Sequence, residues 1–124
     1  MKKKRVLIID DDARNIFALS ATLRAKGFDC VSSNDAREAV KLLERDDTID
    51  IVLTDMMMPE MDGYETIEAI RANEKTRALP VIAVTAQAMP GDRERCISAG
   101  ATEYISKPID VDRLLQLLGN YLPL

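Results

Sequence analysis

The sequence predicts an α/β domain built from five strand–helix pairs. Three observations lead to this prediction: short runs rich in Val and Ile recur, helical patterns separate them, and glycine or aspartate marks several junctions. The two strongest runs, Val6–Ile9 and Ile51–Leu53, are apolar at every position, as parallel strands covered on both faces require. Strict strand–helix alternation therefore predicts a parallel sheet with right-handed crossovers.

Five segments carry the strand signal, and two of them are weaker than the rest. The predicted strands, in chain order, are Val6–Ile9, Phe28–Ser32, Ile51–Leu53, Val81–Val84 and Ala101–Ile105. The second and the fifth are the weaker runs. The other three are the apolar strands that we expect at the centre of the domain.

The predicted helices are recognised by their ends and by their inward faces. Gly27 stops the first helix, Asp35 caps the second, and Asp110 caps the fifth. The fourth is expected to carry Pro90 in its first turn and to end at Gly100. The third helix is expected to open near Gly63 and Tyr64. Apolar residues at helical spacing mark the inward faces of four helices: Ile16, Leu19 and Leu23 in the first; Ala36, Ala39, Val40 and Leu43 in the second; Ile67 and Ile70 in the third; and Val111, Leu114, Leu117, Leu118 and Tyr121 in the fifth.

Length and composition restrict the classes of protein that fit. A chain of 124 residues has the size of one domain, and 47% hydrophobic with 31% charged residues is typical of a folded globular protein. The formal net charge of −4 disfavours nucleic acid as a direct partner. No apolar stretch approaches the roughly 18 residues of a membrane span, so we expect no membrane association.

The cysteine and histidine contents narrow the chemistry further. Cys30 and Cys96 are interpreted as reduced thiols of a cytoplasmic protein, because a domain of this size does not need disulfides. The chain contains no histidine. It therefore cannot phosphorylate itself on histidine, use a histidine base or build a histidine metal site.

Polar residues whose side chains can bind a ligand or react stand at the ends of four of the predicted strands. Asp10–Asp12 follow the first, Asp55 ends the third, Thr85 ends the fourth and Lys107 follows the fifth. In open α/β sheets, ligands bind outside the carboxyl ends of the strands. We therefore expect these side chains to gather at one edge of the sheet.

That set of side chains suits phosphoryl transfer. Carboxylates about 5 Å apart repel by about 3 kcal/mol per pair at an effective dielectric constant near 20, so the cluster must bind protons or a cation. Mg²⁺ prefers oxygen ligands, Lys107 suits a phosphate, and the Thr85 hydroxyl can donate to a phosphate oxygen. We predict Asp55 as the nucleophile that forms an acyl phosphate, with Asp10 and Asp11 holding Mg²⁺.

Four segments in this order resemble the receiver domain of two-component response regulators. They are Ile8–Asp12, Leu53–Gly63, Val84–Ala86 and Ser106–Pro108. The resemblance covers about residues 4–122 and implies that residues 1–124 form a single receiver domain. It also implies a flavodoxin-like (βα)5 fold, with a five-stranded parallel sheet of order 2-1-3-4-5.

The resemblance assigns a role to each member of the site. Asp55 accepts a phosphoryl group from a histidine of a histidine kinase or a histidine phosphotransfer protein. Asp10, Asp11 and Asp55 bind Mg²⁺, and the main-chain carbonyl of Met57 completes the protein ligands. Lys107 contacts the phosphoryl oxygens. The domain is thus a phosphorylated signalling domain and not an enzyme in the usual sense, although it promotes its own phosphotransfer and dephosphorylation.

The resemblance also implies a switch and its readout. Thr85 moves toward the phosphate, Tyr104 turns inward, and the face formed by the fourth helix, fifth strand and fifth helix binds a downstream protein. A cis peptide is expected before Pro108. Family members vary at the positions of Met57 and Gln87, which affect the rate of phosphate loss. The apolar Met57 side chain cannot orient a water, so we expect slow self-dephosphorylation.

Two other functions remain as alternatives. Asp10–Asp12 contains the Asp-x-Asp of haloacid-dehalogenase-like phosphatases, in which Asp10 would carry the phosphate, but Arg14 departs from that family's pattern. A receiver-like binding module that acts without phosphorylation is the second. A flavodoxin-type electron carrier fits poorly, because only five aromatic residues are available and phosphate-binding glycines do not follow the first strand. A stand-alone regulator and a domain of a hybrid kinase both stay open.

Overall fold

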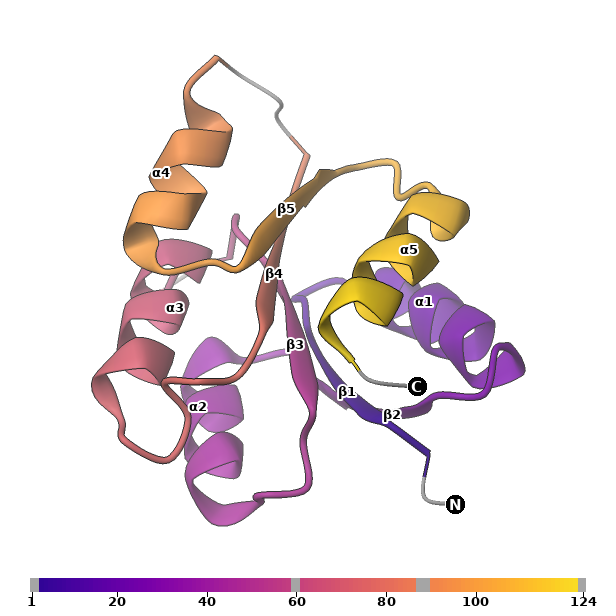
Figure 1. The fold of residues 1–124 in the computed structure, drawn as a ribbon, viewed down its shortest axis with the longest axis horizontal. Helices are drawn as coiled ribbons and strands as arrows, with labels where there is room; N and C mark the ends of the chain where they lie inside the picture. Colours follow the sequence, from indigo (N-terminus) through magenta and orange to yellow (C-terminus); the bar gives the residue numbers. More distant parts are fainter. Residues whose placement is uncertain (1–2, 59–60, 87–89, 123–124) are drawn as a thin grey trace.

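The computed structural model is a three-layer α/β sandwich, and it describes residues 3–58, 61–86 and 90–122 (Figure 1). Strands and helices alternate strictly along these residues. The strands are β1 Arg5–Ile9, β2 Asp29–Ser33, β3 Ile51–Asp55, β4 Val81–Thr85 and β5 Glu103–Ser106. The helices are α1 Ala13–Ala25, α2 Ala36–Arg45, α3 Gly63–Ala72, α4 Asp92–Ala99 and α5 Val111–Tyr121.

The strands form one parallel sheet in the order β2-β1-β3-β4-β5, which confirms the flavodoxin-like topology. In the central pair, Val6 of β1 lies opposite Ile51 of β3, and Ile9 lies opposite Thr54. The chain runs from β1 outward to β2 in one direction and to β3, β4 and β5 in the other. The strand order therefore reverses between β1 and β3, and the carboxyl ends of these strands border the crevice where ligands bind in such sheets.

Helices cover both faces of the sheet, with α2, α3 and α4 on one side and α1 and α5 on the other (Figure 1). Successive residues of a strand point to opposite faces, so Leu7 and Ile9 enter one core while Val6 and Ile8 enter the other. Burying a large aliphatic side chain contributes about 1.5–3 kcal/mol, so the two cores carry most of the fold's stability. The apolar pattern of Val6–Ile9 in β1 is thereby explained.

Aspartates start four of the helices. Asp12, Asp35, Asp62 and Asp110 are the N-caps of α1, α2, α3 and α5, and each side chain accepts a hydrogen bond from a backbone N–H of the first turn. The predicted caps at Asp35 and Asp110 are confirmed. Among the described residues no side chain caps α4, whose N-cap is Gly91 in the left-handed conformation.

Predicted boundaries differ from the structure at several element ends, and at two of them a helix end uses residues that were expected in a strand. The Phe28 N–H donates to the Leu23 carbonyl in the turn that ends α1, so β2 begins one residue later and runs to Ser33. The Ala101 N–H likewise donates to the Cys96 carbonyl at the end of α4, and β5 begins only at Glu103. Pro90 precedes α4 and is not in its first turn.

Other local predictions hold. Gly27 and Gly100 have φ values of 97° and 118° at the ends of α1 and α4, where a left-handed residue stops a helix. Cys30 and Cys96 are free and buried, and they lie in the cores on opposite faces of the sheet. In the part of the chain that the structure describes, no helix has the length and apolar character needed to span a membrane.

Candidate functional site

Three carboxylates meet at the carboxyl edge of the sheet. Asp55 is the last residue of β3 and Asp10 directly follows β1, so their side chains come from the two strands at the reversal of strand order. One oxygen each of Asp10, Asp11 and Asp55 lies within 4.8 Å of the others. Asp10 and Asp55 are buried and Asp11 is exposed. The sheet thus assembles the acidic cluster that the sequence predicts.

The Asp55 carboxylate has a partner on each oxygen. Its Oδ1 accepts a hydrogen bond of 3.2 Å from the Met57 N–H, and its Oδ2 lies 3.6 Å from the Lys107 ammonium. Only 6% of Asp55 is exposed. Burial raises the pKa of this carboxyl above its usual value of 3.8, although the Met57 hydrogen bond and Lys107 oppose the rise. The side chain is therefore fixed in orientation, and its charged form is disfavoured because the carboxylate is partly removed from water.

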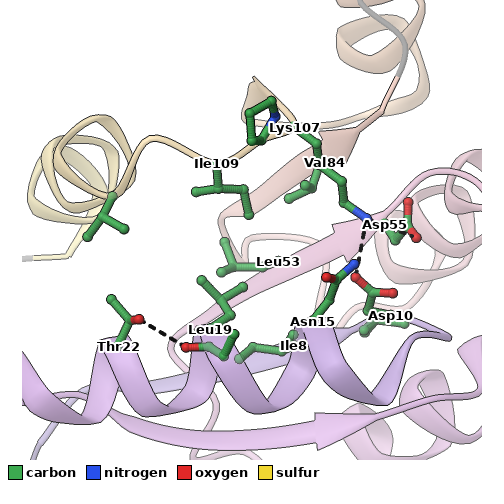
Figure 2. A pocket seen from close by; sticks show the side chains of 14 residues that line it. Ile8, Asp10, Asn15, Leu19, Thr22, Leu53, Asp55, Val84, Lys107 and Ile109 are labelled. Atoms are coloured by element: carbon green, nitrogen blue, oxygen red, sulfur yellow. Dashed lines mark hydrogen bonds and ion pairs between the residues drawn. The ribbon is translucent and has the colours of Figure 1, made fainter.

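Asp10 is fixed in the same way. Its Oδ1 accepts a hydrogen bond of 2.9 Å from the Asp12 N–H, and its Oδ2 lies 3.5 Å from the Lys107 ammonium. Lys107 therefore bridges Asp10 and Asp55, as Figure 2 shows. Asp12 itself accepts a hydrogen bond from the Arg14 N–H and caps α1, so this third aspartate of the run serves the helix.

Lys107 reaches the cluster because the chain after β5 is held against β4. The Lys107 N–H donates to the Thr85 carbonyl over 2.7 Å, and Thr85 lies opposite Ser106 in the β4–β5 pair. The Lys107–Pro108 peptide is cis, as predicted. Thr85 is buried at the end of β4 and Tyr104 is half-buried on β5. Gln87 lies outside the described residues.

The loop after β3 is shaped by close packing against α3. The Gly63 N–H donates to the Met56 carbonyl over 3.2 Å. A Cβ at Gly63 would lie only 2.5 Å from the Met56 sulfur and 2.8 Å from the Asp55 carbonyl oxygen. Met56 and Met58 are buried in the core beneath α3, whereas Met57 is exposed. Only glycine at position 63 allows this helix to start so near the acceptor strand.

A cavity of about 510 Å³ opens beside the cluster, between α1, the sheet and the segment that enters α5 (Figure 2). Asp10, Asp55 and Lys107 line its polar end, and residues such as Leu53 and Ile109 line the rest. Asn15 of α1 also lines it, although sequence reasoning did not select this residue. The sequence gives little indication that Asn15 belongs to the site, because this residue stands inside a helix, one turn past the aspartate run.

The chemistry of these groups fits a divalent cation and a phosphate. Two buried carboxylates and one exposed carboxylate supply hard oxygen ligands, and the exposed Asp11 leaves room for the waters that Mg²⁺ retains. The Lys107 ammonium provides a compact positive charge against Asp55. The fold and the site together define an α/β domain that gathers a lysine and an acidic cluster suited to a divalent cation at the carboxyl edge of its parallel sheet.

Comparison with known proteins assigns the family. Residues 6–119 match the response regulator receiver domain, and the chain belongs to this family. Receiver domains act in two-component and phosphorelay signalling, where they interact with histidine kinases and phosphotransfer proteins. They generally bind Mg²⁺ at an acidic pocket, and Asp10, Asp11 and Asp55 form such a group here.

Individual relatives cover the chain almost completely. The polar-differentiation response regulator DivK of Brucella ovis is 37% identical over 119 residues, which are 96% of each protein. The sensor histidine kinase RcsC of Salmonella typhi is 39% identical over 116 residues, which are 94% of this chain but 12% of the kinase. The receiver domain of the sensor histidine kinase PA1611 from Pseudomonas aeruginosa, solved with magnesium in its active-site cleft, has a TM-score of 0.88 and 35% identity over 97% of this chain and 98% of its own.

Proposed function

We propose that this chain is a phospho-accepting receiver domain in which Asp55 takes a phosphoryl group from a phosphohistidine of a partner. The observation that carries the proposal is the position of the Asp55 carboxylate: buried at the end of β3, within 4.8 Å of Asp10 and Asp11, and 3.6 Å from Lys107. Because the chain contains no histidine, the donor must belong to another protein or to another part of a longer one.

The transfer is an in-line displacement at phosphorus. The bond from phosphorus to the partner's imidazole nitrogen breaks as the bond to an Asp55 oxygen forms, and the imidazole keeps the electron pair. Asp10, Asp11 and the Met57 main-chain carbonyl would hold Mg²⁺, which neutralises charge on the phosphoryl oxygens when bound. Lys107, already between the two buried aspartates, moves from the carboxylate to the phosphoryl group and compensates its charge.

The switch in this proposal starts at Thr85. Phosphorylation adds about −1.5 to −2 charges at Asp55, and the Thr85 hydroxyl donates to a phosphate oxygen from the neighbouring strand. The Lys107 N–H, bonded to the Thr85 carbonyl, links this movement to the segment after β5. Tyr104 then turns inward. A bias of about 2 kcal/mol between two states changes their ratio roughly 30-fold.

The readout surface would be the α4–β5–α5 face, which a downstream protein binds. We place the protein in the cytoplasm, where histidine kinases and phosphotransfer proteins act, and treat residues 1–124 as a single receiver domain. Neither nucleic acid nor a membrane is proposed as a direct partner. The net charge of −4 supports the first of these two statements.

Acetyl phosphate with Mg²⁺ provides the test. The wild-type protein should gain the mass of one phosphoryl group, peptide mapping should locate it on Asp55, and Asp55→Asn should gain none. Phosphate on Asp10 instead would favour an aspartyl-phosphate phosphatase. No gain in the wild-type protein, with folding verified by circular dichroism, would favour a binding module that acts without phosphorylation.

A further inference from the structure

Three consecutive methionines follow the acceptor aspartate, and the structure separates the middle one from its neighbours. Met56 and Met58 are 2% and 9% exposed and belong to the core under α3. Met57 is 60% exposed. Its thioether therefore contributes little to the packing that explains the other two, and its sulfur is open to reagents in solution.

Met57 is also tied to the acceptor. Its N–H donates to Asp55 Oδ1 over 3.2 Å, which fixes the residue beside the carboxylate. Together with Thr85 and Tyr64, Met57 lines a recess of about 580 Å³ on the α4 side of the site. A chemical change of this side chain therefore alters the surface of a recess that Thr85 also lines, at a residue whose backbone is hydrogen-bonded to the Asp55 carboxylate.

We propose that Met57 is a reversible oxidation site that sets the lifetime of the phosphate on Asp55. A hydroperoxide transfers one oxygen atom to the thioether sulfur, which becomes a sulfoxide, while the peroxide is reduced to an alcohol or water. The reverse step uses two thiols, which become a disulfide as the oxygen leaves as water. The proposal rests on the function proposed above, because it needs an acyl phosphate at Asp55.

Selectivity follows from accessibility. Met56 and Met58 are shielded by the core, so a peroxide in solution meets Met57 first among these three residues. The two thiols compete poorly, because Cys30 and Cys96 are 6% and 1% exposed. Burial also raises the pKa of both thiols, which lowers the fraction of the reactive thiolate.

Oxidation of Met57 is expected to speed the loss of phosphate because it makes the side chain polar. A thioether is a very weak acceptor and does not hold a water molecule, whereas a sulfoxide oxygen is a strong acceptor. Hydrolysis of the acyl phosphate needs a water in line with the bond from phosphorus to Asp55. A sulfoxide on Met57 can hold such a water by one hydrogen bond. We expect phosphate loss to accelerate about three- to tenfold, the kinetic effect of one ordinary hydrogen bond.

The experiment compares phosphate lifetimes before and after mild peroxide treatment. Peptide mapping should find the added oxygen on Met57 before Met56 or Met58. After phosphorylation with acetyl phosphate and Mg²⁺ and removal of the reagent, oxidised wild-type protein should lose phosphate three to ten times faster than reduced protein. Methionine sulfoxide reductase with dithiothreitol should restore the slower rate.

Two variants isolate the sulfur. Met57→Leu keeps the main-chain carbonyl and the apolar character, and its lifetime should be the same with and without peroxide. Met57→Gln carries an amide oxygen at a similar distance and should lose phosphate faster than Met57→Leu in the absence of peroxide. Equal oxidation of the three methionines, an unchanged lifetime, or a peroxide response in Met57→Leu equal to that of wild type would overturn the proposal. Failure of the reduced protein to take up phosphate on Asp55 would instead overturn the proposed function, and this inference with it.

Discussion

Replacing Asp55 with asparagine should make the fold more stable, because the acceptor carboxylate is held in an unfavourable electrostatic place. The amide has nearly the same size, and its Oδ1 can still accept from the Met57 N–H. The substitution removes the repulsion from Asp10 and Asp11 and the desolvation of a charge that is 6% exposed. It also removes one attraction, that of Lys107 at 3.6 Å.

The balance of these interactions gives the expected magnitude. At an effective dielectric constant near 20, two carboxylate oxygens no more than 4.8 Å apart repel by at least about 3.5 kcal/mol, and the lysine pair at 3.6 Å attracts by about 4.6 kcal/mol. Two repulsions exceed one attraction, but the exposed Asp11 is screened by water and its share must be reduced. We expect Asp55→Asn to raise the free energy of unfolding by about 1–2 kcal/mol at pH 7.

The effect has a defined pH dependence. The pKa of Asp55 is raised in the folded state, so the folded protein binds this proton more tightly than the unfolded chain does. The carboxylate therefore destabilises the fold increasingly as pH rises from about 3.8 through the folded pKa, and fully above it. The advantage of Asp55→Asn should be greatest above the folded-state pKa of Asp55 and should shrink as pH falls through that pKa toward 3.8.

Urea unfolding followed by circular dichroism, in buffer with a chelator to remove divalent cations, measures this difference. Asp47→Asn is the matched control, because Asp47 is an exposed carboxylate on the loop between α2 and β3. It makes the same change of net charge and should alter stability by less than about 0.5 kcal/mol. The electrostatic reasoning would be refuted if the Asp55→Asn protein were no more stable than wild type at pH 7 while Asp47→Asn showed the expected small effect.

Three further predictions address the metal, the loop and the helix ends. Mg²⁺ at about ten times its dissociation constant should raise the free energy of unfolding of wild type by about 1.4 kcal/mol, and Asp11→Asn should lose most of this gain; equal gains would argue against Asp11 as a ligand. Gly63→Ala should destabilise the fold by about 2 kcal/mol or more in urea titrations, because the new Cβ would lie 2.5 Å from the Met56 sulfur; a neutral effect would mean that the loop relaxes freely. Arg71→Met should cost about 2–4 kcal/mol, because the guanidinium donates to the carbonyls of Leu79 at 2.6 Å and Gly100 at 2.8 Å; a loss below about 0.5 kcal/mol would show that water replaces it.

Local signals in the sequence were sufficient for the elements and for the members of the acidic cluster. The apolar run of β1 and the caps at Asp35 and Asp110 depend on residues only a few positions apart, so they can be recognised without tertiary contacts. Asp10 and Asp55 could be selected because each stands at the carboxyl end of a buried strand, and parallel strands bring these ends to one edge.

Where local signals compete, packing settled the outcome. Phe28 and Ala101 were expected in strands, but their N–H groups complete the turns that end α1 and α4, because an unpaired buried donor costs more than a shorter strand. The order of the strands came from family resemblance and not from periodicity, since a repeating strand–helix pattern is compatible with several arrangements.

The exposure of the three methionines shows, for single side chains, the same difference between what local sequence determines and what tertiary packing determines. In the sequence, Met56, Met57 and Met58 are the same residue, and no local rule separates them. Tertiary packing buries the first and third under α3 and leaves the second in solvent beside Asp55. Contacts between residues far apart in the chain, such as Lys107 with Asp10 and Asp55, likewise exist only once the sheet has formed, because the distance between two side chains is set by the fold and not by their separation in sequence.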